Sequence, residues 1–242
     1  MLDLENAPHV GHFWGLFKQN ISLNQLMETS YTLCWAAQFY GESKMHFSSI
    51  HKTTPKKMLQ AVHKLISEAD AIVTWNGSRH DLPILNKEFI LHGMKPPAPY
   101  KQIDLLKTSR SVFKFASNKL DFVSKALGVG QKLKHEGHEL WVKCMAGNRK
   151  AWKEMEAYNK NDVIILQAVY EKFKPWIKGH ANHNLYGKTL VCPNCGSDKM
   201  QKRGVATTAT LKYNRLQCTS CGKWSRDGES QGPKPDAKYY PL

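Results

Sequence analysis

The chain has 242 residues, 41% of them hydrophobic, which is enough for one sizeable core and a small additional unit. It contains no run of 18 apolar residues, and its Met-Leu-Asp-Leu-Glu start lacks the basic and apolar regions of a secretory signal, so we expect a cytoplasmic protein without a membrane span. Its 35 Lys and Arg against 20 Asp and Glu give a formal net charge of +15, which is typical of proteins that bind a polyanion.

The first half of the chain predicts strands and a crossover helix. Residues 1–4 alternate an acid with apolar side chains and predict the start of an interior strand. Residues 31–40 and 44–50 predict a hairpin around Gly41. Thr54 and Pro55 predict the start of a helix, and the apolar residues 71–75 predict the next strand. A helix between two strands implies a crossover and therefore a mixed sheet.

The rest of the chain predicts helices and then a change of character. We expect helices over residues 81–92, 138–146 and 149–173. A further helix is expected to begin after a cap at Ser117 or Asn118. These elements predict an α/β domain over residues 1–175. Residues 176–188 are polar and predict a linker, 189–227 contain two cysteine pairs, and 228–242 predict a flexible tail.

The spacing of certain acidic residues predicts a metal site. Asp3 and Glu5 leave the same face of a strand, and Tyr158 and Asp162 lie one turn apart on a helix. Asp81 follows a strand of an α/β sheet, where such sheets place their ligands. Carboxylates that converge in a protein interior require cations between them, and two divalent ions about 3.5–4 Å apart suit attack on a phosphodiester.

This set of motifs resembles those of the DEDD superfamily of exonucleases, in the subgroup with a tyrosine in the third motif. B-family polymerase proofreading domains and stand-alone phage and bacterial exonucleases belong to that subgroup. Ala157 stands where the sister subgroup has a histidine, and His80 stands where the family usually has phenylalanine. The resemblance covers residues 1–175 and implies an RNase H-like mixed sheet flanked by helices.

The resemblance also implies an activity. The four carboxylates of Asp3, Glu5, Asp81 and Asp162 would bind two Mg²⁺ or Mn²⁺ ions, Tyr158 would orient the attacking water, and Asn76 would contact the substrate. The expected function is 3′-5′ hydrolysis of single-stranded DNA in a bacterial or phage-infected cell, with replication or recombination proteins as partners. A non-catalytic nucleic-acid-binding protein on a nuclease scaffold and a structure-specific endonuclease are the alternatives, and the choice between DNA and RNA is open.

Two Cys-x-x-Cys pairs predict a second metal site. Cys192 and Cys195 are separated from Cys218 and Cys221 by 22 residues, and a glycine follows each pair. This spacing resembles a zinc ribbon with one structural Zn²⁺, whereas two disulfides or an iron–sulfur centre fit a cytosolic chain less well. Nearby cations are candidate contacts for a nucleic-acid strand: Lys202, Arg203, Lys212 and Arg215. The other two cysteines, Cys34 and Cys144, are expected to be buried thiols.

Overall fold

The computed structural model describes residues 1–18, 20–185 and 190–231, and it divides into two compact units, Met1–Tyr170 and Glu171–Leu242. The predicted linker, ribbon and tail all fall in the second unit. Of these segments, residues 186–189 and 232–242 lie outside the described residues, so most of the predicted tail is not described. The predicted domain boundaries themselves stay predictions. No helix within the described ranges is long and apolar enough to cross a membrane.

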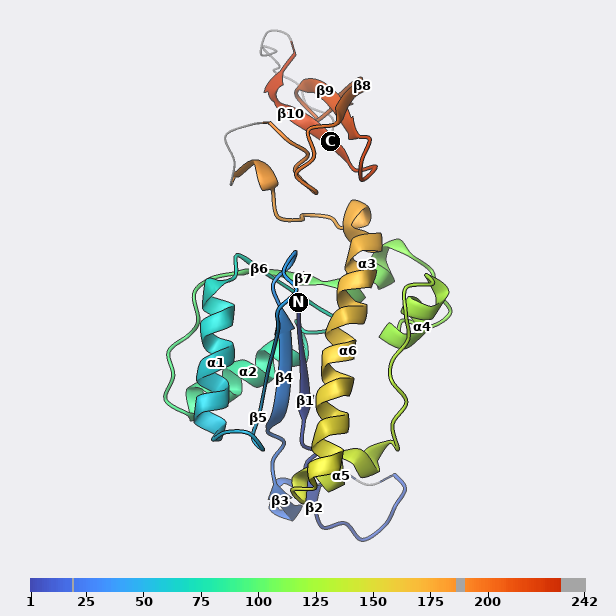
Figure 1. The fold of residues 1–242 in the computed structure, drawn as a ribbon. Coiled ribbons are helices and arrows are strands. Elements are labelled where there is room, and N and C mark those ends of the chain that lie inside the picture. The colour runs from blue at the N-terminus through green and yellow to red at the C-terminus, as the bar shows by residue number, and fades with distance from the viewer. Residues whose placement is uncertain (19, 186–189, 232–242) are drawn as a thin grey trace. The chain divides into compact units, whose positions relative to one another are not determined.

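The first unit contains strands, α-helices and one short 3₁₀ helix (Figure 1). The strands are β1 (Leu2–Asn6), β2 (Val10–Gly11), β3 (Leu26–Glu28), β4 (Thr32–Gln38), β5 (Met45–Ser49), β6 (Ala71–Thr74) and β7 (Lys101–Asp104). The α-helices are α1 (Pro55–Glu68), α2 (Asp81–Leu91), α3 (Leu105–Val112), α4 (Leu120–Ala126), α5 (His138–Met145) and α6 (Arg149–Phe173), which continues three residues into the second unit. The 3₁₀ helix, η1, covers Leu23–Gln25.

The strands of the first unit form separate hydrogen-bonded ladders. The strand order β1-β4-β5 makes an antiparallel sheet, in which Asp3 pairs with Ala36 and Glu5 with Cys34. β6 and β7 form a parallel pair, and β1 contacts β6. The predicted mixed sheet is therefore present as two ladders, one antiparallel and one parallel. The short β2 and β3 form a third ladder, which the sequence did not predict.

Alternation along β1 directs its acidic and apolar side chains to opposite faces of the sheet. Leu2 and Leu4 are buried in a core cluster together with side chains of α1 and α2. Asp3 and Glu5 leave the other face, where α6 runs along the strands (Figure 1). The prediction that this strand lies in the interior is confirmed, because its apolar face is almost fully buried.

The helix signals read from the sequence are mostly confirmed. The Thr54 side chain accepts a hydrogen bond from the Lys57 amide, and Pro55 is the first residue of α1. Gly93, with φ +69°, follows the end of α2. The predicted cap of α4 at Ser117 or Asn118 is wrong. The N-cap is Lys119, because the Asn118 side chain is engaged with Ser109 instead.

β7 and α3 were not predicted from the sequence. Asp104 has one apolar residue before it, Ile103, and the pair Leu105 and Leu106 after it, so the short strand shows no visible periodicity. β7 forms because it pairs with β6, from Ala71 with Lys101 to Thr74 with Asp104. α3 begins directly afterwards, with the Asp104 side chain as its N-cap.

The second unit contains an antiparallel sheet with strand order β10-β9-β8. Its strands are β8 (Met200–Thr207), β9 (Lys212–Cys218) and β10 (Trp224–Ser230), preceded by the short 3₁₀ helices η2 (Lys174–Trp176) and η3 (His183–Leu185). Tyr213 is buried and Trp224 is half exposed, so the tyrosine is part of the small core of this unit.

Candidate functional site

Three of the four predicted carboxylates meet in the structure. Asp3 and Glu5 from β1 and Asp162 from α6 place one oxygen each within 4.8 Å of the others. The meeting follows from the local geometry, because β1 presents every second side chain to α6 and the helix presents Asp162 to the same face. Asp162 is buried, whereas Asp3 and Glu5 are partly buried.

Asp81 lies beside this group. It is buried as the first residue of α2, and its carboxylate forms a hydrogen bond with the backbone of Leu4 in β1. The charge of Asp81 raises the pKa of both Asp3 and Glu5. Asp81 does not belong to the group of three residues whose oxygens lie within 4.8 Å of one another. Its role as a fourth metal ligand stays a prediction.

The pKa values of the clustered carboxylates are raised. Burial, and then the other three carboxylates, raise the pKa of Asp3 well above its ordinary value. Burial and the charge of Asp162 raise the pKa of Glu5 to about 8, and burial raises the pKa of Asp81 to about 6. Ionised carboxylates are therefore unfavourable here unless a cation neutralises them.

One oxygen of the site is also without a partner. Among the residues that the structure describes, Oδ1 of Asp162 is buried and accepts no hydrogen bond. A buried, unpaired carboxylate oxygen costs free energy unless a further ligand completes it. Clustered oxygen donors of this kind suit hard divalent cations such as Mg²⁺ and Mn²⁺. The residues present therefore fit the predicted metal.

Tyr158 lies one turn before Asp162 on α6, and Lys132 contacts both residues. The Lys132 ammonium donates a hydrogen bond of 2.9 Å to the Tyr158 hydroxyl and another to Oδ2 of Asp162. Burial opposes the charge on Lys132, but Asp162 and Tyr158 raise its pKa above its ordinary value. Burial raises the pKa of Tyr158 to about 12, so its phenol does not act as a base near neutral pH.

Asn159 supports Asp3 from the same helix. The Asn159 side chain is fully buried, and its Nδ2 donates a hydrogen bond of 2.7 Å to Oδ2 of Asp3. Its Oδ1 lies 3.9 Å from the Cys34 thiol, which is fully buried, as is Cys144. The prediction that both cysteines are buried thiols is confirmed.

An aromatic group covers one side of the carboxylates. The Trp141 indole from α5 donates a hydrogen bond to Glu5. The His135 ring lies 4.7 Å from the Tyr158 ring and 5.1 Å from the Trp141 ring, measured between centroids. The sequence analysis missed Lys132, Asn159, His135 and Trp141. Only Asn159 had a local signal, because it directly follows Tyr158 in the third motif.

The turn before Asp81 is held by Asp104. Its carboxylate accepts hydrogen bonds from the Asn76 amide at 3.0 Å and from the Ser78 hydroxyl at 2.6 Å. Asn76 has φ +70°, so this bond secures a backbone conformation that L residues rarely adopt. His80 is exposed at the N-cap of α2. Contact of Asn76 with substrate stays a prediction.

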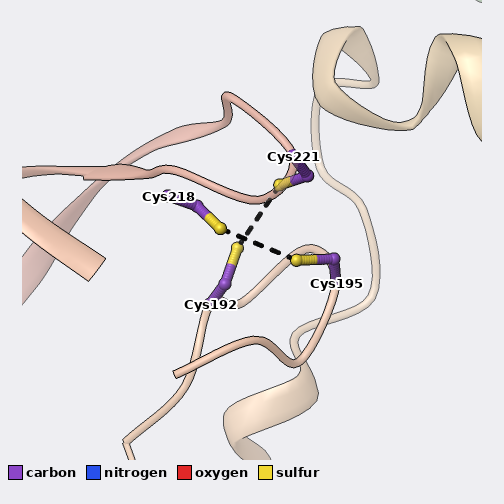
Figure 2. Close-up of side chains that lie close together, drawn as sticks. All are labelled: Cys192, Cys195, Cys218 and Cys221. Carbon is purple, nitrogen blue, oxygen red and sulfur yellow. Dashed lines mark hydrogen bonds between the residues drawn. The ribbon is translucent and has the colours of Figure 1, made fainter. Parts of the chain in front are cut away.

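The four cysteines of the second unit converge on one point (Figure 2). Sγ atoms lie 3.7 Å apart between Cys192 and Cys221 and between Cys195 and Cys218, and all four are free thiols. Four sulfurs placed tetrahedrally at the usual Zn–S distance lie about 3.8 Å from one another. The arrangement therefore fits a zinc ion and excludes disulfides among these residues as they stand.

The two cysteine pairs have matching turns. Gly196 donates its amide to the Cys192 carbonyl and Gly222 donates to the Cys218 carbonyl, both at 2.9 Å. Both glycines have φ +75°, a left-handed conformation that glycine adopts without a steric penalty. Burial opposes ionisation of Cys218, but hydrogen bonds from backbone amides lower its pKa to about 7.

The predicted contacts for a strand lie on β8 and β9, and all four are exposed: Lys202, Arg203, Lys212 and Arg215. Nε of Arg215 donates to the Arg203 carbonyl at 2.8 Å, and its guanidinium lies 5.1 Å from the Trp224 ring. Arg215 therefore also stabilises the sheet.

Comparison with known proteins agrees with this fold. A family described as the RNase_H superfamily matches residues 23–174, which is more than half of the chain. The chain belongs to the RNase_H superfamily. The matched residues 23–174 include Asp81, Tyr158 and Asp162. Asp3 and Glu5 lie before the matched segment.

Among solved structures, this RNase_H superfamily chain is similar to the family B DNA polymerase from the hyperthermophilic archaeon Pyrobaculum calidifontis. The TM-score is 0.52 and the sequence identity is 15%. The match covers 60% of this chain and 22% of the polymerase chain. At this identity the similarity concerns the fold alone. Among curated proteins, none matches this chain.

Proposed function

We propose that the first unit is a metal-dependent 3′-5′ exonuclease that hydrolyses single-stranded DNA. One observation carries the proposal: the carboxylates of Asp3, Glu5 and Asp162 lie within 4.8 Å of one another in an interior that disfavours their charge. Membership of the RNase_H superfamily and the order of the three motifs support it. The 3′-5′ direction and the preference for DNA rest on the resemblance to tyrosine-type DEDD exonucleases.

The proposal assigns each residue of the site a task. Asp3, Glu5, Asp81 and Asp162 hold two Mg²⁺ or Mn²⁺ ions, which would supply an activated water and charge stabilisation of the departing 3′ oxygen. The Tyr158 hydroxyl orients the water by hydrogen bonding and does not deprotonate it, because its pKa is about 12. Lys132 holds Tyr158 and Asp162 together through its ammonium.

Substitution of the central acids tests this function. We expect Asp3→Ala and Asp162→Ala to abolish Mg²⁺-dependent shortening of a 3′-labelled single-stranded oligonucleotide, because each removes a metal ligand. Glu68→Gln is the matched control, since Glu68 is an exposed acid on α1. Activity that survives in both alanine variants contradicts the assigned site.

The same assay distinguishes the alternatives. An exonuclease cannot cut a circular single strand, so cleavage of circles by the wild type shows an endonuclease. A wild type that retards the oligonucleotide with Mn²⁺ present, without shortening it, is a non-catalytic binding protein. Parallel 3′- and 5′-labelled DNA and RNA substrates give the direction of hydrolysis and the preferred nucleic acid.

We further propose that the four-cysteine cluster holds one structural Zn²⁺ as a zinc ribbon. The sulfur distances of 3.7 Å and the paired glycine turns support it. All four protein ligands are thiolates, so a tetrahedral ion has no open position for a reaction. The exposed cations on β8 and β9 would bind the phosphate backbone of a nucleic-acid strand, such as a substrate of replication or recombination.

A further inference from the structure

In the first unit, residues 12–23 form a loop with exposed aromatic side chains, which we call the aromatic loop. It joins β2 to η1 and β3, and Gln19 lies outside the described residues. Trp14 is 97% exposed, Phe17 85% and Leu16 79%. Soluble proteins rarely display neighbouring large apolar side chains in this way unless the surface binds something.

The base of the aromatic loop is fixed. The His12 amide donates to the Gln25 carbonyl at 2.9 Å, and the Gln25 side chain donates back to the His12 carbonyl at 3.0 Å. At Gly11 a Cβ atom would lie 2.8 Å from the Gln25 carbonyl oxygen, so the end of β2 and the end of η1 approach closely there. The exposed apolar side chains therefore lie on a loop whose two ends are joined by hydrogen bonds, and not on a frayed terminus.

The loop is near the candidate active site in the chain and in the fold. It follows β2, which comes directly after the strand β1 that carries Asp3 and Glu5. In the connection between β1 and β2, the Ala7 amide donates a hydrogen bond of 2.8 Å to the Tyr31 carbonyl. Figure 1 shows β2 and β3 at the end of the first unit where α5 lies. α5 contributes Trp141, which donates a hydrogen bond to Glu5.

The charge of the aromatic loop and of the whole chain favours a polyanion as the partner. The sequence from Asn6 to Met27 contains no acidic residue, and it includes Lys18 together with His9 and His12. The whole chain has a net charge of +15, so a second copy is repelled and a polyanion is attracted. Exposed aromatic rings beside a cation suit a single strand, because a cation attracts its phosphates and every base has a face that stacks.

We propose that the aromatic loop is a base-stacking platform for a single-stranded nucleic acid, with Trp14 and Phe17 as the stacking side chains. The assignment of this strand as the nuclease substrate rests on the proposed function, because the loop follows the strand that carries Asp3 and Glu5. The stacking itself needs no catalysis. It explains why two large aromatic side chains remain exposed on an anchored loop.

Binding without turnover tests the proposal. Anisotropy of a labelled single-stranded oligonucleotide is measured with EDTA present, for the wild type and for Trp14→Ala/Phe17→Ala. We expect the double variant to bind about thirtyfold more weakly, because it loses two stacking rings. Ile90→Ala/Leu91→Ala is the matched control, because these side chains on α2 are also exposed, 74% and 72%, and should leave the affinity unchanged. Trp14→Phe should retain most of the affinity.

The outcomes separate this proposal from the proposed function. Equal oligonucleotide affinity of the double variant and the wild type overturns the stacking role, as does a loss that the α2 control shares. Loss of binding only to phosphatidylserine vesicles, or a change only in oligomeric state, also overturns it in favour of a lipid surface or a second copy. Loop-dependent binding by a wild type that shortens no oligonucleotide supports the platform and contradicts the nuclease.

Discussion

Asn159 shows how a single side chain can prepare the site. Its amide fixes Oδ2 of Asp3 and leaves the other carboxylate oxygen available to a ligand. The amide is itself immobilised, because Asn159 is fully buried in α6 and its other side-chain atom faces the Cys34 thiol. Groups that orient metal ligands commonly contribute about 10–100-fold to metal affinity.

We therefore expect Asn159→Ala to weaken Mn²⁺ binding by about tenfold, because Asp3 loses its fixed orientation. Calorimetric titration of the variant with Mn²⁺ measures the effect without any turnover. Asn161→Ala is the matched control, since Asn161 lies on the same helix and its side chain donates a hydrogen bond to the Gln131 carbonyl. Equal Mn²⁺ affinity in both variants would show that Asn159 has only a packing role.

The raised pKa values at the site predict how metal and pH act together. The pKa of Glu5 rises from 4.5 to about 8 on folding. Its stabilising contribution without metal is therefore fully present below about pH 4.5 and is lost as the pH rises through about 8. A bound metal replaces that proton, so the gain in Tm on adding Mg²⁺ should grow from pH 5 towards about pH 8.

Thermal melts with and without Mg²⁺ across this range measure the difference. The Asp162→Ala variant serves as the reference, because its site has lost a ligand while ionisable groups outside the site titrate as before. A gain in Tm that is independent of pH, or equal in the two proteins, contradicts metal binding by these carboxylates.

At the scale of elements, the turn between β6 and α2 depends on a glycine. A Cβ at Gly77 would lie 2.3–2.6 Å from three side-chain atoms of Thr74, although Gly77 itself has no left-handed backbone conformation. The absence of a side chain is therefore required by packing. The turn carries Asn76 at φ +70° and positions Asp81 at the start of α2.

We expect Gly77→Ala to destabilise the protein by about 2–3 kcal/mol, because the added methyl group forces the turn apart. Gly93→Ala is the comparison, since a Cβ there meets nothing within 4 Å and only the positive φ is penalised, at about 1 kcal/mol. Urea unfolding of both variants gives the two free energies. Gly77→Ala as mild as Gly93→Ala would contradict the close approach to Thr74.

Elements with a local signal were predicted well, and those without one were missed. The hairpin of β4 and β5, the capped start of α1 and the long α6 follow from periodicity and capping residues in their own segments. β7 was missed because four residues of mixed polarity become a strand only when β6 lies beside them. The hydrogen bond from the Asn76 amide to Asp104 depends on the same pairing, because Asp104 is the last residue of β7.

At the scale of the whole molecule, the chain consists of two compact units with different sources of stability. The first has extensive buried clusters on both faces of its sheet. The second has a three-stranded sheet in which many side chains are exposed, so its core is small, and the proposed zinc ion would contribute to its folding free energy.

Removal of the metal should therefore affect only the second unit. We expect Cys192→Ser to reduce the zinc content from one ion per chain to none and to unfold β8, β9 and β10. Hydrogen exchange should show lost protection there, with the first unit unchanged. Cys144→Ser is the matched control, because that cysteine lies in the core of the first unit and should leave the zinc content unchanged. Full protection of the ribbon strands in zinc-free Cys192→Ser would contradict a structural metal.

Features whose parts lie close together along the chain could be predicted from the amino-acid sequence. Acids two apart on a strand, a tyrosine and an aspartate four apart on a helix, and paired cysteines with a following glycine all have their geometry set by the backbone period or by a tight turn. That is why Asp3, Glu5 and Asp162, and the four-cysteine cluster, could be named before the structure was known.

The distant groups that contact these local motifs are brought there by the packing of the folded chain. Lys132 comes from a loop between α4 and α5, yet its ammonium binds Tyr158 and Asp162 on α6. Trp141 reaches Glu5 from α5 in the same way. Nothing in the local sequence specifies such contacts, because packing of several elements brings them together at once, and a long side chain has no periodic signature that reveals its partner.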